Sequence, residues 1–427
     1  MPNPTDDVER LLWCIRPAVD ITHLHAPLPE KMVQQHPTAW PYREASLRTA
    51  EHHLVVTETV NQERSLAPVF EGGPRSLPPL SAGEGTEAVE SEVVREVRSR
   101  LRRALSNEEP LLVAALEHRL YKAARAHMQF RRLDLSAYRG LVVATQHSSS
   151  VRAAILAAEE QGTPVTYIPH APVAGNPVYL DLPASTAGLR GVGESDYYSR
   201  ELGIPAASLD VIGNLGSDLL ETPAPAIRPG APGILALSPH PSETLERMFS
   251  LVSDASIGEL IVAPHPATQL KDVRPLMRPG WQLAEGWRTM DLLTEGPAFL
   301  LHLSSGVAWE SAALGIPTAT IRLDQTPVNY PFLVDESVYP SIFTSSEAAS
   351  FVARARGGVI DRSALLAHAR RWCSFDGVEA KERLRVLLRR NPGESAESQT
   401  RCLHDGWSAG GAALARSWIA STPVAPA

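Results

Sequence analysis

The chain has 427 residues, of which 44% are hydrophobic and 21% charged, and its formal net charge is −8. This length is enough for two or three domains with cores of ordinary size. A mildly acidic chain lacks the clustered lysine and arginine that non-specific binding to phosphates requires, so we expect no nucleic-acid partner. The cysteines, at 14, 373 and 402, are too few and too widely spaced for a disulfide framework or a CxxC metal site, and we predict no metal.

The first residues, MPNPTDDVER, lack the basic region and apolar stretch of a secretory signal. No window approaches the ~18 apolar residues of a membrane span. We therefore expect a cytoplasmic protein and leave peripheral membrane contact open. Lysine occurs only at 31, 122, 271 and 381, so nearly all the positive charge is arginine. We interpret this bias as the mark of a GC-rich genome, which says nothing about mechanism.

In the first half of the chain, the expected secondary structure changes near residue 141. Residues 61–90 are rich in Pro, Gly, Ser and Glu and are expected to form a loop, and helices are expected over 88–107 and 110–129. After 141, apolar runs with β-branched residues alternate with helical patterns. The runs are LVVATQ, PVTYIPH, LRGVGES and LDVIGN. This alternation predicts a parallel sheet with helical crossovers, within a first domain over 1–216.

The second half repeats the alternation after a linker over 217–232, SDLLETPAPAIRPGAP. The new strand candidates are GILALSP, ELIVAPHP, WQLAEG, AFLLHLS and TATIRLD. They predict a second parallel sheet in a domain over 233–395, and residues 396–427 are expected to pack back on the first domain as a helical tail. The predicted fold class is α/β, with two doubly wound, Rossmann-like domains. The cleft between them is the expected site.

In parallel α/β sheets, ligands bind beyond the carboxyl ends of the strands. The run AFLLHLS is followed by Ser304, Ser305 and Gly306, then by a predicted helix with Glu310 in its first turn. Small residues and the free N–H groups of a helix start suit a phosphate, and the carboxylate suits ribose hydroxyls. The alternative is an ordinary serine cap with an acidic first turn, which stabilises a helix by about 1 kcal/mol.

Histidines follow several of the other predicted strands. His265 stands between two prolines after ELIVAPHP and can donate to phosphate, or else bind a loop carbonyl; His240 follows ILALSP. In the first domain, His147 follows VVATQ and His170 follows VTYIP, and either can serve as a general base near neutral pH. Glu194 is the acid nearest a strand end, with capping of the next helix as its alternative.

Together, these positions resemble the GT-B glycosyltransferases. His265 within Pro-His-Pro, followed by Ser304-Ser305, is similar to the HP and SS motifs of bacterial sialyltransferases and of capsule Kdo and polysialic acid transferases. In those families the histidine and serines hold the nucleotide phosphate of a CMP-sugar, which implies the same roles here. The resemblance also implies that Glu310 binds the ribose, because a glutamate does so in the donor corner of many GT-B enzymes.

Two other families are similar in parts. The run ASLDVIGNLGSDLL resembles the hinge-proximal Gly-Asn of UDP-N-acetylglucosamine 2-epimerases, which implies a place at the donor site for Asn214. That family carries acidic catalytic residues after two first-domain strands, whereas this chain has Gln146-His147 and His170 there. CDP-glycerol-type phosphotransferases have a His-Gly that would fall on His170-Ala171, where alanine replaces the glycine.

The sequence therefore predicts an enzyme, an inverting, metal-independent glycosyltransferase that moves a sugar from a CMP- or UDP-linked donor to an acceptor hydroxyl. A nucleotide-sugar 2-epimerase or a CDP-glycerol-type phosphotransferase is the alternative. His170 is the preferred base, ahead of His147 and Glu194. The donor is a substrate, and no cofactor is expected. The sequence leaves open the sugar, the stereochemical outcome and the oligomeric state. It also leaves open the acceptor, because residues 1–140 carry no recognisable motif.

Overall fold

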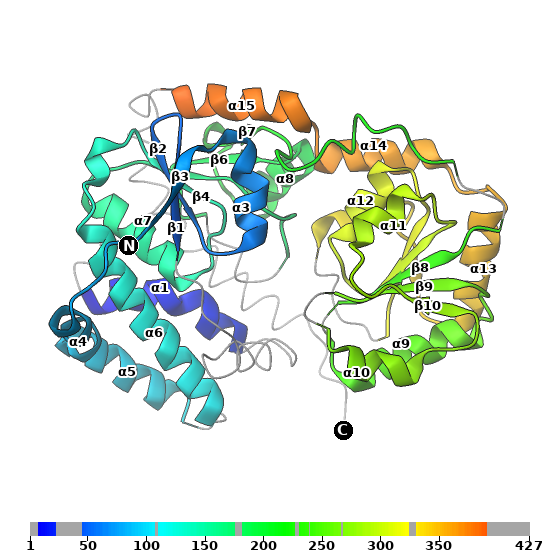
Figure 1. The fold of residues 1–427 in the computed structure, drawn as a ribbon, viewed down its shortest axis with the longest axis horizontal. Helices are drawn as coiled ribbons and strands as arrows, with labels where there is room; N and C mark the ends of the chain where they lie inside the picture. Colours follow the sequence, from blue (N-terminus) through cyan, green and yellow to red (C-terminus); the bar gives the residue numbers. More distant parts are fainter. Residues whose placement is uncertain are drawn as a thin grey trace.

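A computed structural model describes residues 7–22, 45–106, 110–175, 182–226, 230–238, 240–265, 268–323 and 330–390. Residues 396–427, expected as a helical tail, lie outside this description. The described chain forms two α/β domains that lie side by side (Figure 1). The fold class predicted from the alternation of strands and helices is confirmed: each domain is built on a sheet of parallel strands covered by helices.

In the described ranges, thirteen strands divide between the two sheets. The first sheet contains β1 (Ser46–Ala50), β2 (His53–Thr57), β3 (Glu71–Ser76), β4 (Leu141–Val143), β5 (Val165–Tyr167), β6 (Thr186–Leu189) and β7 (Leu209–Val211). The second contains β8 (Gly233–Ala236), β9 (Leu260–Ala263), β10 (Trp281–Leu283), β11 (Leu300–His302), β12 (Thr318–Ile321) and β13 (Ser341–Ile342).

The described helices surround these sheets. Those before the second sheet are α1 (Asp7–Thr22), α3 (Val60–Leu66), α4 (Ala82–Glu90), α5 (Glu92–Ala104), α6 (Pro110–Arg131), α7 (Ser149–Glu160) and α8 (Val192–Asp196). Those after its first strand are α9 (Ser242–Asp254), α10 (Leu270–Val273), α11 (Thr289–Thr294), α12 (Val307–Ala313), α13 (Ser345–Arg356), α14 (Arg362–Trp372) and α15 (Gly377–Arg389).

The first sheet is mixed rather than fully parallel. Its order is β3-β1-β2-β4-β5-β6-β7, and the strands from β2 to β7 run parallel. The hairpin β1–β2 and the edge pair β1–β3 are antiparallel. Hydrophobic periodicity did not reveal this edge, because β3 has the sequence EGGPRS and every one of its residues is exposed.

The loop expected over 61–90 is wrong, because most of this segment is regular structure. α3 begins at the cap Thr59, whose hydroxyl accepts from the N–H of Gln62. α4 begins at Ser81 with a full capping box that includes Glu84. Glycine and proline content concealed these helices, while the capping residues that define their starts were present in the sequence.

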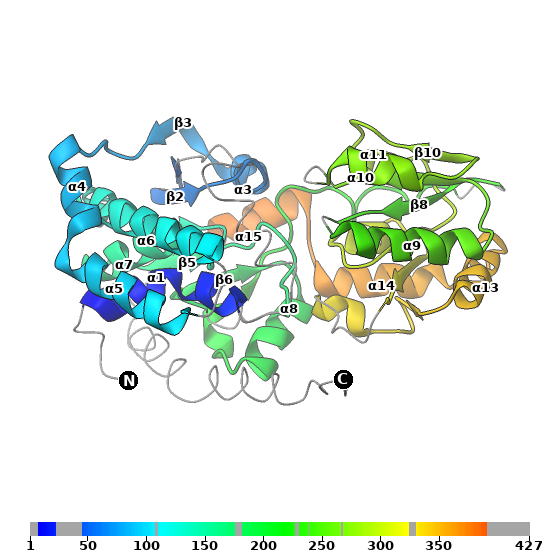
Figure 2. The same ribbon diagram turned by 90° about the horizontal axis from the view of Figure 1, so that it is seen from below.

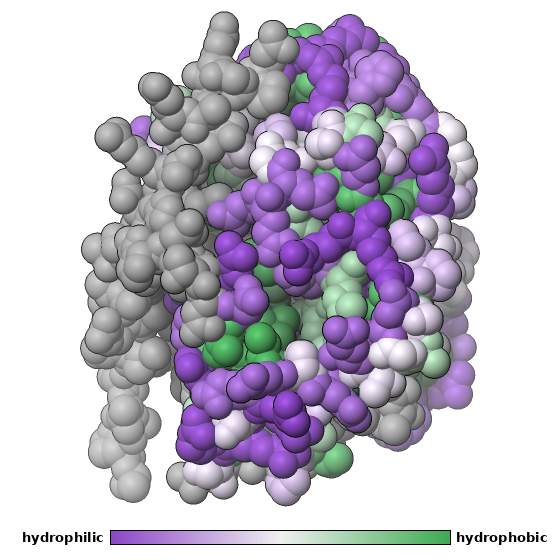
Figure 3. Space-filling model, turned by 90° about the vertical axis from the view of Figure 1, so that its left-hand side faces the viewer, coloured by the Kyte–Doolittle hydropathy of each residue, from purple (hydrophilic) through white to green (hydrophobic). Residues whose placement is uncertain are grey.

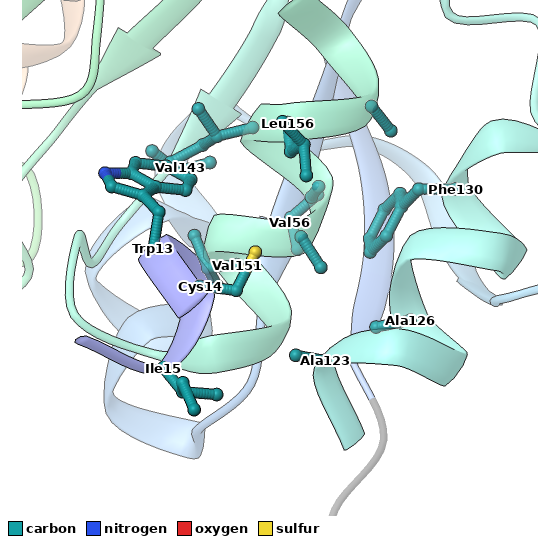
Figure 4. Close-up of a cluster of buried hydrophobic side chains, with 14 of the residues drawn as sticks. Trp13, Cys14, Ile15, Val56, Ala123, Ala126, Phe130, Val143, Val151 and Leu156 are labelled. Carbon is teal, nitrogen blue, oxygen red and sulfur yellow. The ribbon is translucent and has the colours of Figure 1, made fainter. Parts of the chain in front are cut away.

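The two faces of the first sheet are covered by different means. The parallel strands follow one another in chain order, so right-handed crossovers place their helices on one face. The helices α1, α6 and α7 pack there against residues such as Val56 and Val143 (Figure 4), and α5 belongs to the same core. The opposite face holds Val55, Val142 and Ile212, and it is covered by α3 and by the distant α15. The last described helix thus belongs to the first domain, although it lies within the range expected for the second.

The second sheet is fully parallel, with the order β10-β9-β8-β11-β12-β13. Numbered within the sheet, this is the 3-2-1-4-5-6 order of doubly wound nucleotide-binding folds. One face packs against α9 and α13 and the other against α11, α12 and α14. The second-domain Rossmann-like prediction is therefore confirmed.

The chain crosses between the domains twice, and the two crossings are hydrogen-bonded to each other. The N–H of Asn214 donates to Phe375 O at 2.9 Å, and that of Gly377 donates to Ser217 O at 2.8 Å. The N–H of Leu220 donates to the carboxylate of Asp376 at 2.6 Å. Close to this hinge, α8 of the first domain meets α14 of the second (Figures 1 and 2).

The first domain has a mostly polar outer surface on one side, as expected when helices cover both faces of a buried sheet (Figure 3). On the first-domain face shown in Figure 3, hydrophilic side chains predominate, and hydrophobic ones appear mainly in a hollow between them. Within the described ranges, none of the helices has both the length and the apolar character needed to cross a membrane.

Candidate functional site

The site expected from the topology lies where β8 and β11 are neighbours. The crossovers that leave these strands diverge, since α9 packs on one face of the sheet and α12 on the other. Ligands bind at such a switch point, beyond the carboxyl ends of the two strands. The two loops that begin there are joined, because the hydroxyl of Ser238 donates to Ser304 O at 2.7 Å. The pair defines one polar corner rather than two independent loops.

The paired serines of this corner have different surroundings. The Oγ of Ser304 is buried and has no hydrogen-bond partner among the described residues. The Oγ of Ser305 accepts from the N–H of Val307 at 3.3 Å. The helix α12 has only seven residues, and Ser305 already occupies its first N–H. The hydroxyls and the small Gly306, rather than a helix dipole, are therefore the features of this corner that can receive an anion.

Glu310 lies one turn into α12, near the first domain. Burial raises the pKa of its carboxyl to about 7, and the positive charge of Arg190 opposes this rise. The nearby arginine belongs to the first domain, so this carboxyl lies close to the domain boundary. A carboxyl that is neutral near pH 7 can both donate and accept hydrogen bonds.

The two remaining histidine candidates of the second domain lie at the same edge of the sheet. His265 follows β9, the neighbour of β8, and is exposed. His240 follows β8 and is half-buried. An exposed imidazole after the adjacent strand lies on the side of the sheet where the switch point is. The expected arrangement of His265 beside the serines is compatible with these positions.

The first domain presents His170 at the end of β5. Its Nδ1 lies 2.6 Å from Ala144 O, and a carbonyl oxygen only accepts, so Nδ1 carries the hydrogen. In the neutral ring the acceptor is then Nε2. Burial lowers the pKa of His170, the hydrogen bond to Ala144 raises it, and the charge of Arg190 lowers it. The net shift is downward, so the ring stays neutral and able to take a proton near pH 7.

His170 also belongs to the loop that faces the serine corner. A Cβ placed on Gly306 would lie 3.7 Å from Cδ of Pro172, two residues after His170. The loop after β5 and the loop after β11 therefore meet across the domain boundary. This contact brings together a candidate base and a candidate anion-binding corner from opposite domains.

Glu194 and His147 have partners that point to structural roles. Glu194 is 1% exposed, and its two carboxylate oxygens accept from the N–H groups of Val173 (3.1 Å) and Arg190 (2.9 Å). Burial raises the pKa of Glu194, and the charge of Arg190 and these hydrogen bonds oppose the rise. The Nδ1 of His147 lies 3.0 Å from the hydroxyl of Thr145. Of the three base candidates, His170 is the one with an identified acceptor nitrogen beside the second domain.

Asn214 lies at the hinge. Its side-chain oxygen accepts from the N–H of Gly216 at 3.2 Å, and its backbone pairs with the second crossing. The neighbouring Gly213 has φ +96°, and a Cβ there would lie 2.2 Å from Phe375 O. The close approach of the two crossings thus explains the pair Gly213-Asn214. The contacts described for Asn214 lie at the hinge and do not involve the serine corner.

Sequence reasoning missed Arg190 and Trp309. Arg190 directly follows β6 and is 5% exposed, and its guanidinium lies 4.6 Å from the centre of the Trp309 ring in α12. The indole N–H of Trp309 donates to Ala369 O at 2.9 Å. The position of Arg190 just after the run TAGL was the available signal, because the other site candidates also follow strands. Its contact with the second domain was not visible in the sequence.

A second overlooked residue, His302, lies within β11 two residues before Ser304. It is fully buried, and burial lowers the pKa of its ring to about 3. Its Nε2 lies 3.5 Å from the hydroxyl of Thr320, while Nδ1 has no partner among the described residues. A neutral ring beneath the serine corner adds polarity to the sheet without adding charge.

Several solved structures are similar to this chain in fold, at low sequence identity. No protein-family model matches it, and no curated protein does. UDP-GlcNAc 2-epimerase from Neisseria meningitidis, bound to UDP-GlcNAc, is 14% identical with a TM-score of 0.44, over 71% of this chain and 97% of that one. The Methanocaldococcus jannaschii UDP-GlcNAc 2-epimerase is 16% identical with a TM-score of 0.43, over 63% and 82%. The lipopolysaccharide outer core galactosyltransferase WaaB, in its apo form, is 14% identical with a TM-score of 0.40, over 66% and 81%.

Proposed function

We propose that the protein is a glycosyltransferase that moves a sugar from a nucleotide-linked donor to an acceptor hydroxyl. The observation that carries this proposal is the meeting of two loops from different domains. The loop after β11 brings Ser304 and Gly306, at the switch point of a sheet with nucleotide-binding topology. The loop after β5 brings His170, whose Nε2 can accept a proton. A donor in the second domain would then lie opposite a base in the first.

The donor half of the site binds the nucleotide. Its phosphate would be held by the hydroxyls of Ser304 and Ser305 and by the imidazole of His265, with His240 at the end of the neighbouring strand. Gly306 lets the phosphate approach the backbone, and the carboxyl of Glu310 would bind ribose hydroxyls. These are the phosphate-binding roles expected for the HP and SS motifs, and the residues of both motifs follow strands at one edge of the second sheet.

The acceptor half performs the proton transfer. As the acceptor oxygen forms its bond to the anomeric carbon, Nε2 of His170 takes the hydroxyl proton, and the bond from that carbon to the nucleotide phosphate breaks. The electron pair leaves with the phosphate, which the serine hydroxyls and His265 stabilise. Attack opposite the leaving phosphate gives inversion at the anomeric carbon. This route uses protein groups in the place that a metal ion takes elsewhere, so we expect EDTA to leave the rate unchanged.

The proposal is tested first by nucleotide binding. Thermal unfolding is measured with CMP, UMP, CDP, UDP, GDP and TDP, because a ligand at 100 times its dissociation constant stabilises by about 2.7 kcal/mol. We expect stabilisation by a cytidine or uridine nucleotide in the wild type and its loss in Ser304→Ala. If none of the six nucleotides stabilises the wild type, the proposal of a nucleotide-sugar enzyme is contradicted.

Incubation with a UDP- or CMP-sugar separates transfer from epimerisation. Without an acceptor, a transferase leaves the donor intact or hydrolyses it slowly, whereas a 2-epimerase returns the epimeric sugar nucleotide. We expect no epimer by NMR. The appearance of an epimer would replace the transferase proposal with the epimerase, and transfer of glycerol phosphate from CDP-glycerol would replace it with the phosphotransferase.

A further inference from the structure

Arg190 is a buried cation at the boundary between the domains, and the proposed transfer step gives it no role. The backbone around it is fixed. The N–H of Ser374 donates to Arg190 O at 3.0 Å, and a Cβ on Gly191 would lie 2.4 Å from the carbonyl carbon of Trp372. The ring of Trp309 supports the guanidinium from the second domain at 4.6 Å. The guanidinium is therefore placed by both domains rather than left to rotate in solvent.

A second arginine in the chain shows what a structural buried guanidinium looks like. Arg152 is 1% exposed and also lies 4.6 Å from the centre of a tryptophan ring, that of Trp13. Its Nε donates to Gln146 O at 2.7 Å, and its Nη1 donates to Trp13 O at 3.1 Å. Backbone carbonyls thus satisfy this cation. The two arginines have matched burial and matched stacking, so their hydrogen bonds can be compared directly.

Arg190 differs from Arg152 in the hydrogen bonds of its guanidinium. Arg190 is 5% exposed, and among the described residues no hydrogen bond from its guanidinium to a protein acceptor is found, although none of its nitrogens is fully enclosed. Its charge influences Glu194, His170 and Glu310. Removing a charged group from water is costly unless acceptors replace the lost solvation, and a guanidinium carries five N–H donors. Stacking on an aromatic ring replaces only part of that solvation. An oxyanion ligand would supply the missing acceptors.

The place of Arg190 indicates which part of a ligand it would meet. Its guanidinium lies on the Trp309 ring, next to Glu310 in α12, and its charge influences both Glu310, on the donor side, and His170, on the acceptor side, so it is close to both halves of the site. In a nucleotide sugar, the atoms between the nucleoside and the acceptor are the phosphates and the sugar. The anionic groups available there are a second phosphate or a carboxylate on the sugar.

We propose that Arg190 binds an oxyanion of the donor that lies beyond the nucleoside and its first phosphate. This inference rests on the proposed function. The oxyanion is the second phosphate of a nucleoside diphosphate sugar, or the carboxylate of a sugar acid linked to a nucleoside monophosphate. Arginine binds both groups through paired N–H bonds in one plane. A donor held in this way is bound by serines of one domain and an arginine of the other.

The test compares ligands that differ only in the proposed oxyanion. Dissociation constants of UMP, UDP, CMP and CMP-N-acetylneuraminate are measured by calorimetry for the wild type, Arg190→Gln and Arg190→Lys. We expect both variants to bind UMP and CMP within about threefold of the wild type. Arg190→Gln should bind one of the other two ligands about tenfold to a hundredfold more weakly, with Arg190→Lys between. A loss confined to UDP identifies the phosphate, and a loss confined to CMP-N-acetylneuraminate identifies the carboxylate.

The controls separate this inference from the proposed function. Arg152→Gln removes the matched structural arginine and should leave the UDP/UMP and CMP-N-acetylneuraminate/CMP affinity ratios unchanged, whatever it does to the melting temperature. Unchanged ratios in both Arg190 variants, or equal weakening of all four ligands, would overturn the role of Arg190 while nucleotide binding by the wild type stands. A wild type that binds none of the four would overturn the proposed function, and the inference with it. If Arg190→Gln does not fold, Arg190→Lys decides.

Discussion

The hydrogen bond from His170 to a carbonyl decides how this residue can act. Because Nδ1 must donate to Ala144 O, the nitrogen available to an acceptor hydroxyl is Nε2. The sequence predicted a histidine at this strand end but could not specify the tautomer. His147 likewise follows a strand, β4, but its Nδ1 lies 3.0 Å from the hydroxyl of Thr145, which can donate as well as accept, so this contact does not determine its tautomer.

For His170→Asn we expect kcat to fall by about 10²–10⁴, with a smaller change in KM, because the variant loses the proton acceptor and keeps a polar group. The matched variant His147→Asn should retain turnover. The downward pKa shift also places the acidic limb of kcat/KM below pH 6.5, the ordinary histidine value, since a base with a lowered pKa stays unprotonated in more acidic solution. Wild-type turnover in His170→Asn, or a large loss only in His147→Asn, would contradict this assignment.

Glu310 gives a stability prediction at the same scale. Its folded-state pKa of about 7 lies above the ordinary value of 4.5, so between these values the folded state binds more protons than the unfolded state. Stability then falls as pH rises through this window, and below pH 4.5 the residue has no effect. We expect Glu310→Gln to gain stability relative to the wild type between pH 4.5 and 7 and to hold that difference above it. Urea unfolding at pH 4.5, 6 and 8 checks this, and parallel pH dependences of the two proteins would refute it.

At the scale of elements, α15 shows how a helix can belong to a domain far from it in the sequence. Its buried residues Leu384 and Leu388 pack against Val142 and Ile212 of the first sheet. Periodicity correctly predicted helix over 345–390, but it does not state which sheet an apolar face will cover. The one-sided crossovers of the first sheet leave a face bare, and the returning chain covers it.

We expect Leu384→Ala to lower the free energy of unfolding of the first domain by about 2–5 kcal/mol, because it removes a fully buried side chain. The control Val378→Ala lies on the same helix at a position that is 79% exposed and should change stability by less than about 0.5 kcal/mol. Urea unfolding of the two variants and the wild type measures both effects. Equal effects of the two substitutions would show that α15 does not cover the first sheet.

At the scale of the whole molecule, the hinge sets how the two halves of the site meet. The two crossings approach so closely that position 213 has no room for a side chain and requires φ +96°. Hydrogen bonds then join the crossings, including that from the N–H of Leu220 to the buried Asp376. A doubly connected hinge restricts the relative motion of the domains more than a single linker would.

Gly213→Ala should therefore destabilise the protein by more than about 1 kcal/mol and loosen the domain arrangement, because a Cβ meets Phe375 O and the backbone angle disfavours L-residues. Gly230→Ala is a matched control, since Gly230 also has a positive φ, of +77°, but a Cβ there meets nothing within 4 Å. Thermal unfolding measures the first effect, and small-angle scattering measures the second. A Gly213→Ala protein that scatters and melts like Gly230→Ala would show that the crossings do not need this close approach.

The sequence by itself determined the local features of this protein. Alternating apolar runs and helical patterns defined two α/β domains, and polar residues after those runs, including Ser304 and His170, marked the edges at which we propose that a ligand binds. These features depend on neighbours a few residues apart, so periodicity, capping and strand ends reveal them.

Only the tertiary structure decided which of these groups meet. The 3-2-1-4-5-6 strand order joined Ser238 to Ser304, and the domain boundary brought Arg190 onto Trp309. The tertiary structure also packs α15 against the sheet of the first domain. Such contacts join residues dozens to hundreds of positions apart, and they arise because exposed apolar faces must be covered by whatever segment the topology returns to them.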